Sequence, residues 1–523
     1  MARIGKAVLI VGVLFLAACA PGPKAVVENA PPAVDWTARL AEADALYAAG
    51  HFSALRDALR IYGEALSAPA SHPGVAEKYL RAAIAFELRQ KDLGILPEAP
   101  PVDPLLLVAA RPILARYATW LELLTGLTTK IKGIPGIDQS GGRTDEALLD
   151  WMGDRVPAID KELGGAAQTD DLAAALRLAL RREFYFKFRD KVDPETYLGL
   201  HPGSRLVAFQ AAIFQGVKVP ELEALLTADP GFTDAHYYLG EEALGAGNLL
   251  TAERHYLAFK DKIPGSLSVL ISLAKVAFQT EEMETCLDYN EQALALLPTY
   301  RDALLGKGLC LGHLGRNDEA LAALGRLLEL GTYYMGEGHF WTAWNLNELG
   351  RLEEARRSIA SAWVFLVGVS DVATLSGTIA YRQGRLGDAE RDLREALALD
   401  PSSGDAAYYL GKVYADRKDW LNSGIYFAGA AVSYEAQEKG FEKKIREIEA
   451  SEMSPERKAR LVAKKKAQVL SVQVTKATCQ YNGAAGYHNA RSFERALELA
   501  RLAAAHPAFA DKAAELIKII QNR

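Results

Sequence analysis

The sequence predicts an all-α protein, built as a right-handed solenoid of stacked helical hairpins. The first observation behind this prediction is an internal repeat, since residues 229–240 and 400–411 are identical at eight of twelve positions. Their separation of 171 residues is five periods of 34 residues plus one. The second is that each unit laid out on this period has two helical stretches with a break between them. The units start at 233, 267, 301, 336, 370 and 404, with one residue inserted near Met335.

Small residues recur at two positions of each unit, where two helix backbones can approach closely. The eighth position holds Gly240, Ala274, Gly308, Ala343, Gly377 and Gly411, and the twentieth holds Ala252, Cys286, Ala320, Ala355 and Ala389. Proline ends three of the units, at Pro264, Pro298 and Pro401, because it lacks an N–H group and stops a helix. This pattern resembles the tetratricopeptide repeat. The resemblance implies hairpins that each bury a neighbour's apolar face in one continuous stack.

The resemblance fades outside this block and divides the chain into seven segments. Residues 199–232 fit one decayed unit, residues 36–69 resemble a unit with Gly50 at its turn, and Lys512 to Ile520 reads as a capping helix. The predicted segments are a leader (1–18), a lipidated cysteine and tether (19–34), N-terminal repeat-like helices (35–95), a non-repeat helical segment (96–198), the array (199–437), a charged helical extension (438–476) and a terminal unit with its cap (477–523).

The segment between the N-terminal helices and the array does not follow the period. Its apolar stretch from Leu105 to Leu127 is interrupted by Arg111, Pro112 and Arg116, which favours a buried helical hairpin over a membrane span. The glycine-rich stretch 133–142 lacks the Gly-Lys-Ser/Thr ending of a phosphate-binding loop. We therefore predict no nucleotide site here.

The N-terminus has the layout of an export signal. Arg3 and Lys6 precede a short apolar run, and small residues lead into Cys19. Residues 16–19 (Leu-Ala-Ala-Cys) resemble the lipobox of bacterial lipoproteins, which implies cleavage before Cys19 and acylation of its thiol. Ala20 follows where that family's inner-membrane retention signal has Asp, so the resemblance implies an outer-membrane protein facing the periplasm. A buried structural cysteine is the alternative.

The sequence shows little sign of chemistry. The net charge is −6, which argues against a nucleic-acid partner, and the nine histidines have no metal-ligand spacing. We predict no cofactor, no metal and no enzyme activity. Cys286 and Cys310 are expected as buried thiols, with a disulfide as the alternative. The basic cluster 457–466 is expected to be a solvated helix face, with contact to anionic lipid as the alternative.

The concave surface is the predicted binding site. In tetratricopeptide arrays the first helix of each unit lines this surface, and the matching positions here are mainly aromatic and aliphatic. The resemblance assigns a partner-binding groove to Tyr237, Ile271, Phe278, Leu305, Leu309, Phe340, Trp344, Tyr381 and Tyr408. Such a surface favours a peptide with apolar or aromatic side chains over a carboxylate clamp. Alternatively, residues 105–200 or the C-terminal helices fill the groove.

Three functions follow from these features. The first is a lipid-anchored scaffold for protein–protein interaction in an envelope assembly, secretion or transport complex. The second is an accessory lipoprotein that binds a small hydrophobic ligand or partners a periplasmic solute-binding protein. The third, an enzyme with its site in residues 96–200, has no supporting motif.

Overall fold

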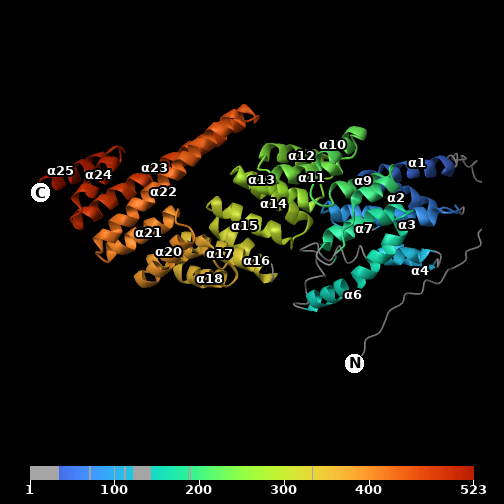
Figure 1. The fold of residues 1–523 in the computed structure, drawn as a ribbon, viewed down its shortest axis with the longest axis horizontal. Coiled ribbons are helices and arrows are strands. Elements are labelled where there is room, and N and C mark those ends of the chain that lie inside the picture. Colours follow the sequence, from blue (N-terminus) through green and yellow to red (C-terminus); the bar gives the residue numbers. More distant parts are fainter. Residues whose placement is uncertain are drawn as a thin grey trace, which may run out of the picture.

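A computed structural model describes residues 34–69, 72–98, 100–110, 114–121, 143–185, 188, 190–331 and 334–522. Within these ranges every regular element is a helix, and consecutive helices pack as hairpins (Figure 1). The predicted all-α class with tetratricopeptide-type hairpins is therefore confirmed. The leader, Cys19 and the glycine-rich stretch 133–142 lie outside the described residues.

The array consists of paired helices that begin close to the predicted unit starts. The first helix of each unit, called helix A, begins within one residue of the start set by the 34-residue period, and helix B follows it. The array helices are α11 (Asp234–Gly245), α12 (Leu249–Lys262), α13 (Leu267–Gln279), α14 (Met283–Leu296), α15 (Arg301–His313), α16 (Asn317–Glu329), α17 (Met335–Glu348), α18 (Leu352–Phe365), α19 (Ser370–Arg382), α20 (Leu386–Leu399) and α21 (Gly404–Asp416).

The small residue at the eighth position of a unit faces a large side chain at its twenty-fourth position. A Cβ atom on Gly377 would lie 2.5 Å from Cγ of Leu393, and one on Gly308 would lie 2.6 Å from Cγ of Leu324. Leu393 and Leu324 are both fully buried. The glycines therefore let helix B pack directly on the backbone of helix A.

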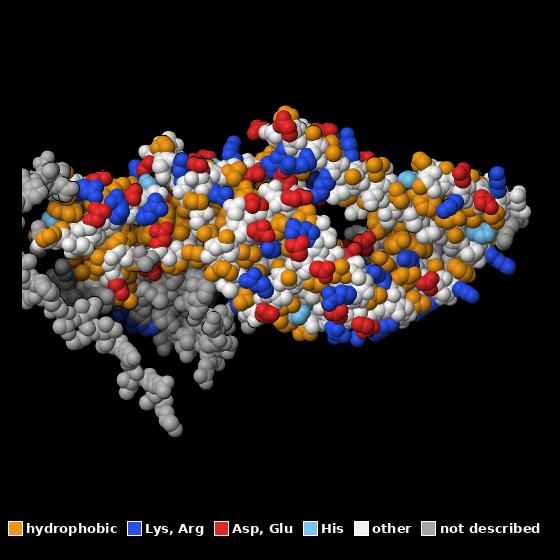
Figure 2. Space-filling model, turned by 180° about the vertical axis from the view of Figure 1, so that it is seen from behind, with side chains coloured by type: hydrophobic (Ala, Val, Ile, Leu, Met, Phe, Trp, Pro, Cys, Tyr) orange, Lys and Arg blue, Asp and Glu red, His pale blue; other side chains and the backbone are white. Residues whose placement is uncertain are grey.

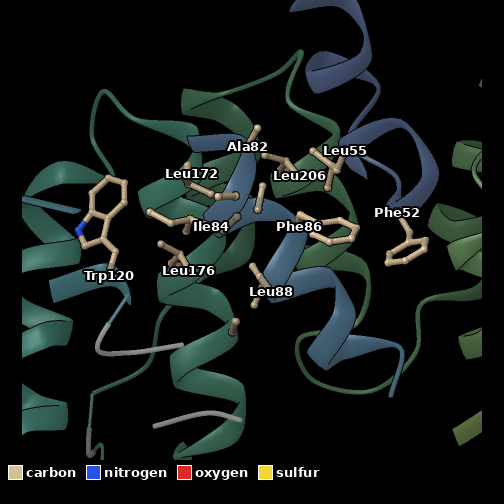
Figure 3. Close-up of a cluster of buried hydrophobic side chains, with 14 of the residues drawn as sticks. Phe52, Leu55, Ala82, Ile84, Phe86, Leu88, Trp120, Leu172, Leu176 and Leu206 are labelled. Carbon is tan, nitrogen blue, oxygen red and sulfur yellow. The ribbon is translucent and has the colours of Figure 1, made fainter. Parts of the chain in front are cut away.

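The N-terminal helices and the non-repeat segment form one core. Side chains from α2, α3, α7 and α9 meet there, among them Leu55, Ile84, Leu176 and Leu206 (Figure 3). The described part of the non-repeat segment thus packs on the N-terminal helices. The elements are α1 (Trp36–Ala49), α2 (Phe52–Ser67), α3 (Val75–Asp92), α4 (Pro104–Ala110), α6 (Arg143–Ala166), α7 (Asp171–Glu183), α8 (Pro194–Leu200), α9 (Arg205–Ala212) and α10 (Val219–Ala228).

A buried charged contact joins this core to the array. Arg89 of α3 is 2% exposed, and its Nε lies 3.2 Å from Oδ2 of Asp234 at the start of α11. The same carboxylate accepts a hydrogen bond from the backbone N–H of Phe52 at 2.8 Å. The Arg89 guanidinium lies 3.7 Å from the centre of the Phe209 ring. The start of the first helix A, at Asp234, is therefore buried against the N-terminal core and is not open to a partner.

The C-terminal part contains two helices much longer than those of the array. α22 (Trp420–Ala450) and α23 (Pro455–Asn489) form a hairpin, and α24 (Phe493–Ala504) and α25 (Ala510–Gln521) follow it. α23 begins at Pro455, where the Ser454 hydroxyl accepts a hydrogen bond from the N–H of Arg457 at 3.3 Å. No helix in the part of the chain with described structure combines the length and apolar character that a membrane span requires.

Candidate partner-binding surface

Adjacent aromatic residues at the fifth and sixth positions of helix A mark the concave surface in three units. The pairs are Tyr237–Tyr238, Phe340–Trp341 and Tyr408–Tyr409. In each pair the rings meet edge to face, with centroids 5.0 to 5.4 Å apart. In two of the pairs the sixth-position ring packs against helix A of the preceding unit. Trp341 contacts His313 of α15, and Tyr409 contacts Tyr381 of α19, and these contacts hold each pair in a fixed orientation.

One group of aromatic side chains spans three units, and we call it the aromatic row: Phe278, His313, Phe340, Trp341 and Trp344. His313 is at its centre, with ring centroids 5.4 Å from Phe278, 5.5 Å from Trp341 and 5.8 Å from Trp344. Burial lowers the pKa of His313, and the positive charge of Lys464 on α23 lowers it further. The row is therefore a largely neutral, partly exposed aromatic surface across α13, α15 and α17.

A second group combines three tyrosines with a lysine. Nζ of Lys412 on α21 lies 4.7 Å from the centre of the Tyr381 ring, 5.2 Å from Tyr409 and 5.4 Å from Tyr408. Burial lowers the pKa of this lysine. The ammonium group is held over three π-faces, which gives this end of the surface a cationic and aromatic character.

The structure places the nine predicted groove residues in different environments. Phe278, Leu305, Leu309, Phe340, Trp344, Tyr381 and Tyr408 are half-buried on the helices A of their units. Ile271 is only 7% exposed and belongs to a core cluster against which Leu96 packs. Tyr237 packs against Tyr256 and Phe259 and lies against the N-terminal core. A partner could therefore reach the surface from α15 to α21 more readily than at α11 and α13.

His313, Trp341 and Tyr409 contribute rings to this surface and were not among the nine predicted groove residues. Trp341 and Tyr409 occupy the sixth position of their units, one residue after the predicted groove residues Phe340 and Tyr408. The signal for them was present, because each follows a predicted groove aromatic directly in the sequence.

The long hairpin reaches back to the first two units of the array. Arg457 near the start of α23 pairs with Glu253 of α12, with Nη1 and Oε2 2.6 Å apart, and also with Glu282. Lys465 pairs with Glu281 at 2.5 Å. The basic cluster is therefore neither a solvated face nor free for lipid at these positions, which corrects the prediction for Arg457 and Lys465. Figure 2 shows a hollow between this hairpin and the array.

The two cysteines of units two and three are bonded to each other. Cys286 of α14 and Cys310 of α15 form a disulfide with their Cα atoms 6.4 Å apart, and both are buried. The expectation of two separate thiols is wrong. Cys479 remains a buried free thiol, and burial raises its pKa to about 12, so it has no thiolate character near neutral pH.

Two other kinds of site, a metal site and a ligand cavity, have less support in the described residues. Among the residues with described structure, no group of three or more His, Cys, Asp or Glu side chains could hold a metal ion. A cavity of about 420 Å³ lies between α1, α2 and α3. Asp44 in its wall already accepts from the Tyr62 hydroxyl and from Lys78, each at 2.6 Å, whereas the buried Tyr47 hydroxyl has no hydrogen-bond partner in the described part of the chain.

Comparison with known proteins supports the repeat assignment. Residues 312–367 and 374–438 match the family of the tetratricopeptide repeat, and no curated protein matches the sequence. Among solved structures, the type IV pilus biogenesis factor PilW is 15% identical (TM-score 0.36, covering 38% of this chain and 90% of PilW). A tetratricopeptide repeat protein from Parabacteroides merdae is 14% identical (TM-score 0.34, 55% of this chain and 98% of that protein). MamA from Desulfovibrio magneticus RS-1 is 15% identical (TM-score 0.30, 33% and 96%).

Proposed function

Because this chain is a tetratricopeptide-repeat protein, we propose that it is a lipid-anchored scaffold of a bacterial cell envelope. Its concave surface from α15 to α21 binds a partner protein through a segment that carries apolar or aromatic side chains. The observation that carries this proposal is the aromatic row, in which rings from three successive helices A contact one another while remaining partly exposed. Half-exposed aromatic rings on rigid helices are typical anchors of protein interfaces.

The address rests on the leader and on Cys19, whose lipobox resemblance supports anchoring in the outer membrane with the body in the periplasm. The buried disulfide is consistent with this address, because disulfides persist in oxidising compartments and are rare in the cytosol. Labelled palmitate should be incorporated into the protein and lost in Cys19→Ala. Incorporation that persists in the variant would contradict the anchoring proposal.

The binding role is tested by recovery of partners from detergent-solubilised envelopes. We expect Trp344→Ala and Tyr408→Ala each to reduce recovery of a specific partner by about tenfold or more, the loss typical of a central aromatic anchor. Phe365→Ala is the matched control, because Phe365 is 56% exposed and lies at the end of α18, outside the aromatic row. Circular dichroism melting checks that each variant is folded. If both groove variants keep every partner, the concave surface is not the binding site.

An accessory role in ligand or transporter handling is the second candidate. The hollow between the hairpin and the array favours it, because a ligand carrier needs a recess between its elements in which the ligand can lie. Recovery of a periplasmic solute-binding protein or transporter component would select this role. Recovery of components of an assembly or secretion machine would select the scaffold.

A further inference from the structure

The long hairpin is held in two chemically different ways along its length. At its base, Phe427, Ala430 and Tyr434 of α22 pack into an apolar cluster together with Cys479 of α23. Beyond Tyr434, no residue of α22 is buried. On the facing part of α23 the buried residues are Leu461 and Lys465, so the far half of the hairpin contributes one buried apolar side chain and acts as an arm that projects from a fixed base.

Charged groups hold the tip of this arm on the array. Arg457 donates to Glu282 from Nε at 2.9 Å and to Glu253 from Nη1 at 2.6 Å, and Arg460 also pairs with Glu282. On the next turn of α23, Glu281 accepts hydrogen bonds from Lys465 at 2.5 Å and from Gln468 at 2.9 Å. These contacts join residues 175 to 204 positions apart in the sequence.

The position of Glu281 has a conformational cost. Its φ is +61°, in the left-handed region, at a turn between helices A and B where four other units have glycine with φ between +74° and +77°. A side chain other than glycine is disfavoured in this conformation. Glycine at this turn would have no side chain, whereas the Glu281 carboxylate accepts hydrogen bonds from Lys465 and Gln468.

We propose that the α22–α23 hairpin is a latch that closes over the concave surface and opens at its tip. The closed state is held by the contacts of Arg457, Arg460, Lys465 and Gln468 with the acidic turn at Glu281 and Glu282, while the apolar base remains packed. Lys464 also donates to the backbone carbonyl of Glu281, three residues after Phe278 at the end of the aromatic row, so opening widens access to that end of the row. This last step, access for a partner, rests on the proposed function, whereas the latch does not.

The latch is tested by the distance between two spin labels, one at Glu452→Cys on the tip and one at Asp288→Cys on α14, in protein that lacks Cys19 and Cys479. The opening variant is Glu281→Lys with Glu282→Gln. Lysine fits the backbone at this turn, because Lys418 occupies the equivalent turn of the sixth unit with a φ of +60°. The sixteen residues of α22 beyond Tyr434 form an arm about 24 Å long, so a rotation of about 30° moves the tip by about 12 Å.

We expect one short, narrow distance in the unmodified protein and a distribution broadened and lengthened by about 10 Å in the opening variant. Glu284→Lys with Glu242→Gln is the control, since it changes the charge equally at two exposed positions without touching the hairpin. Adding Lys465→Glu to the opening variant should restore the short distance. A narrow short distance in the opening variant, an equal shift in the control or no recovery in the compensated variant would overturn the latch. The measurement uses no partner, so its failure is independent of the proposed function.

Discussion

Substitution of Gly377 by alanine tests whether the hairpin packing described above limits the stability of the array. A Cβ atom at this position would lie 2.5 Å from Cγ and 3.1 Å from the backbone N of Leu393. Alanine favours a helix interior over glycine by about 0.5–1 kcal/mol. Overpacking of a filled core costs about 1–3 kcal/mol, and here a helix backbone must also move. We therefore expect Gly377→Ala to destabilise the α19–α20 hairpin by about 1–2 kcal/mol.

Hydrogen exchange followed by mass spectrometry measures the local stability of the α19–α20 hairpin. The method suits a repeat protein, because its units need not unfold together. Amides of α19 and α20 should exchange about tenfold faster in Gly377→Ala, since 1.4 kcal/mol is about a factor of ten. Gly325→Ala in α16 is the matched control, because no atom lies within 4 Å of the added Cβ. It should slow exchange in α15 and α16. Slower exchange in Gly377→Ala as well would refute the reasoning, because the helix propensity would then outweigh the contact with Leu393.

Two further predictions concern buried and paired charges. Arg89→Met leaves the fully buried carboxylate of Asp234 without its cation, so the free energy of unfolding of the N-terminal region in urea should fall by about 3–5 kcal/mol; a loss below 1 kcal/mol would show that the pair is not needed. Nδ1 of His236 lies 2.9 Å from Nδ1 of His255. Burial lowers the pKa of His255 to about 4, and a smaller part of this shift comes from the charge of His236. Because the unfolded chain then binds protons that the folded protein does not, stability should fall by about 1 kcal/mol between pH 6.5 and pH 4, after allowance for solvent screening. His255→Asn should flatten this part of the pH profile of hydrogen exchange in α11 and α12, and an unchanged profile would exclude the pair as its source.

The sequence was most informative where a contact recurs in each unit. The 34-residue period placed the starts of the helices A, and the small residues at the eighth position identified where helix B packs on helix A. The start of α23 has the same local character, because Ser454 and Pro455 act through local hydrogen bonding and backbone geometry alone. Each of these features depends on residues close together in the chain, so local pattern and turn chemistry are sufficient to predict it.

Contacts between distant segments could not be read in this way. Ile271 satisfies the groove pattern, yet Leu96 from outside the array packs against its cluster. Asp234 at the start of the first helix A is likewise buried by a distant segment, since it pairs with Arg89 of α3. The pairing of Cys286 with Cys310 depends on the relative rotation of α14 and α15, which the repeat pattern does not specify. The groove prediction was therefore least informative at α11 and α13, where segments outside the array pack against it.

The hairpin contact changes how a chain of this kind should behave. In an ideal repeat array each unit touches only its neighbours, and stability is a sum of unit and interface terms. Here the ion pairs of Arg457 and Lys465 join α23, which follows the sixth unit, to the first and second units, so a change in curvature anywhere between them displaces both sets of charges. Conversely, a partner that alters this curvature would work against the tip contacts. Because the tip is held mainly by ion pairs and the base by apolar packing, the tip contacts should break before those of the base. The effect of a partner in the groove on the position of the hairpin should therefore disappear when Glu281 and Glu282 are replaced by uncharged residues.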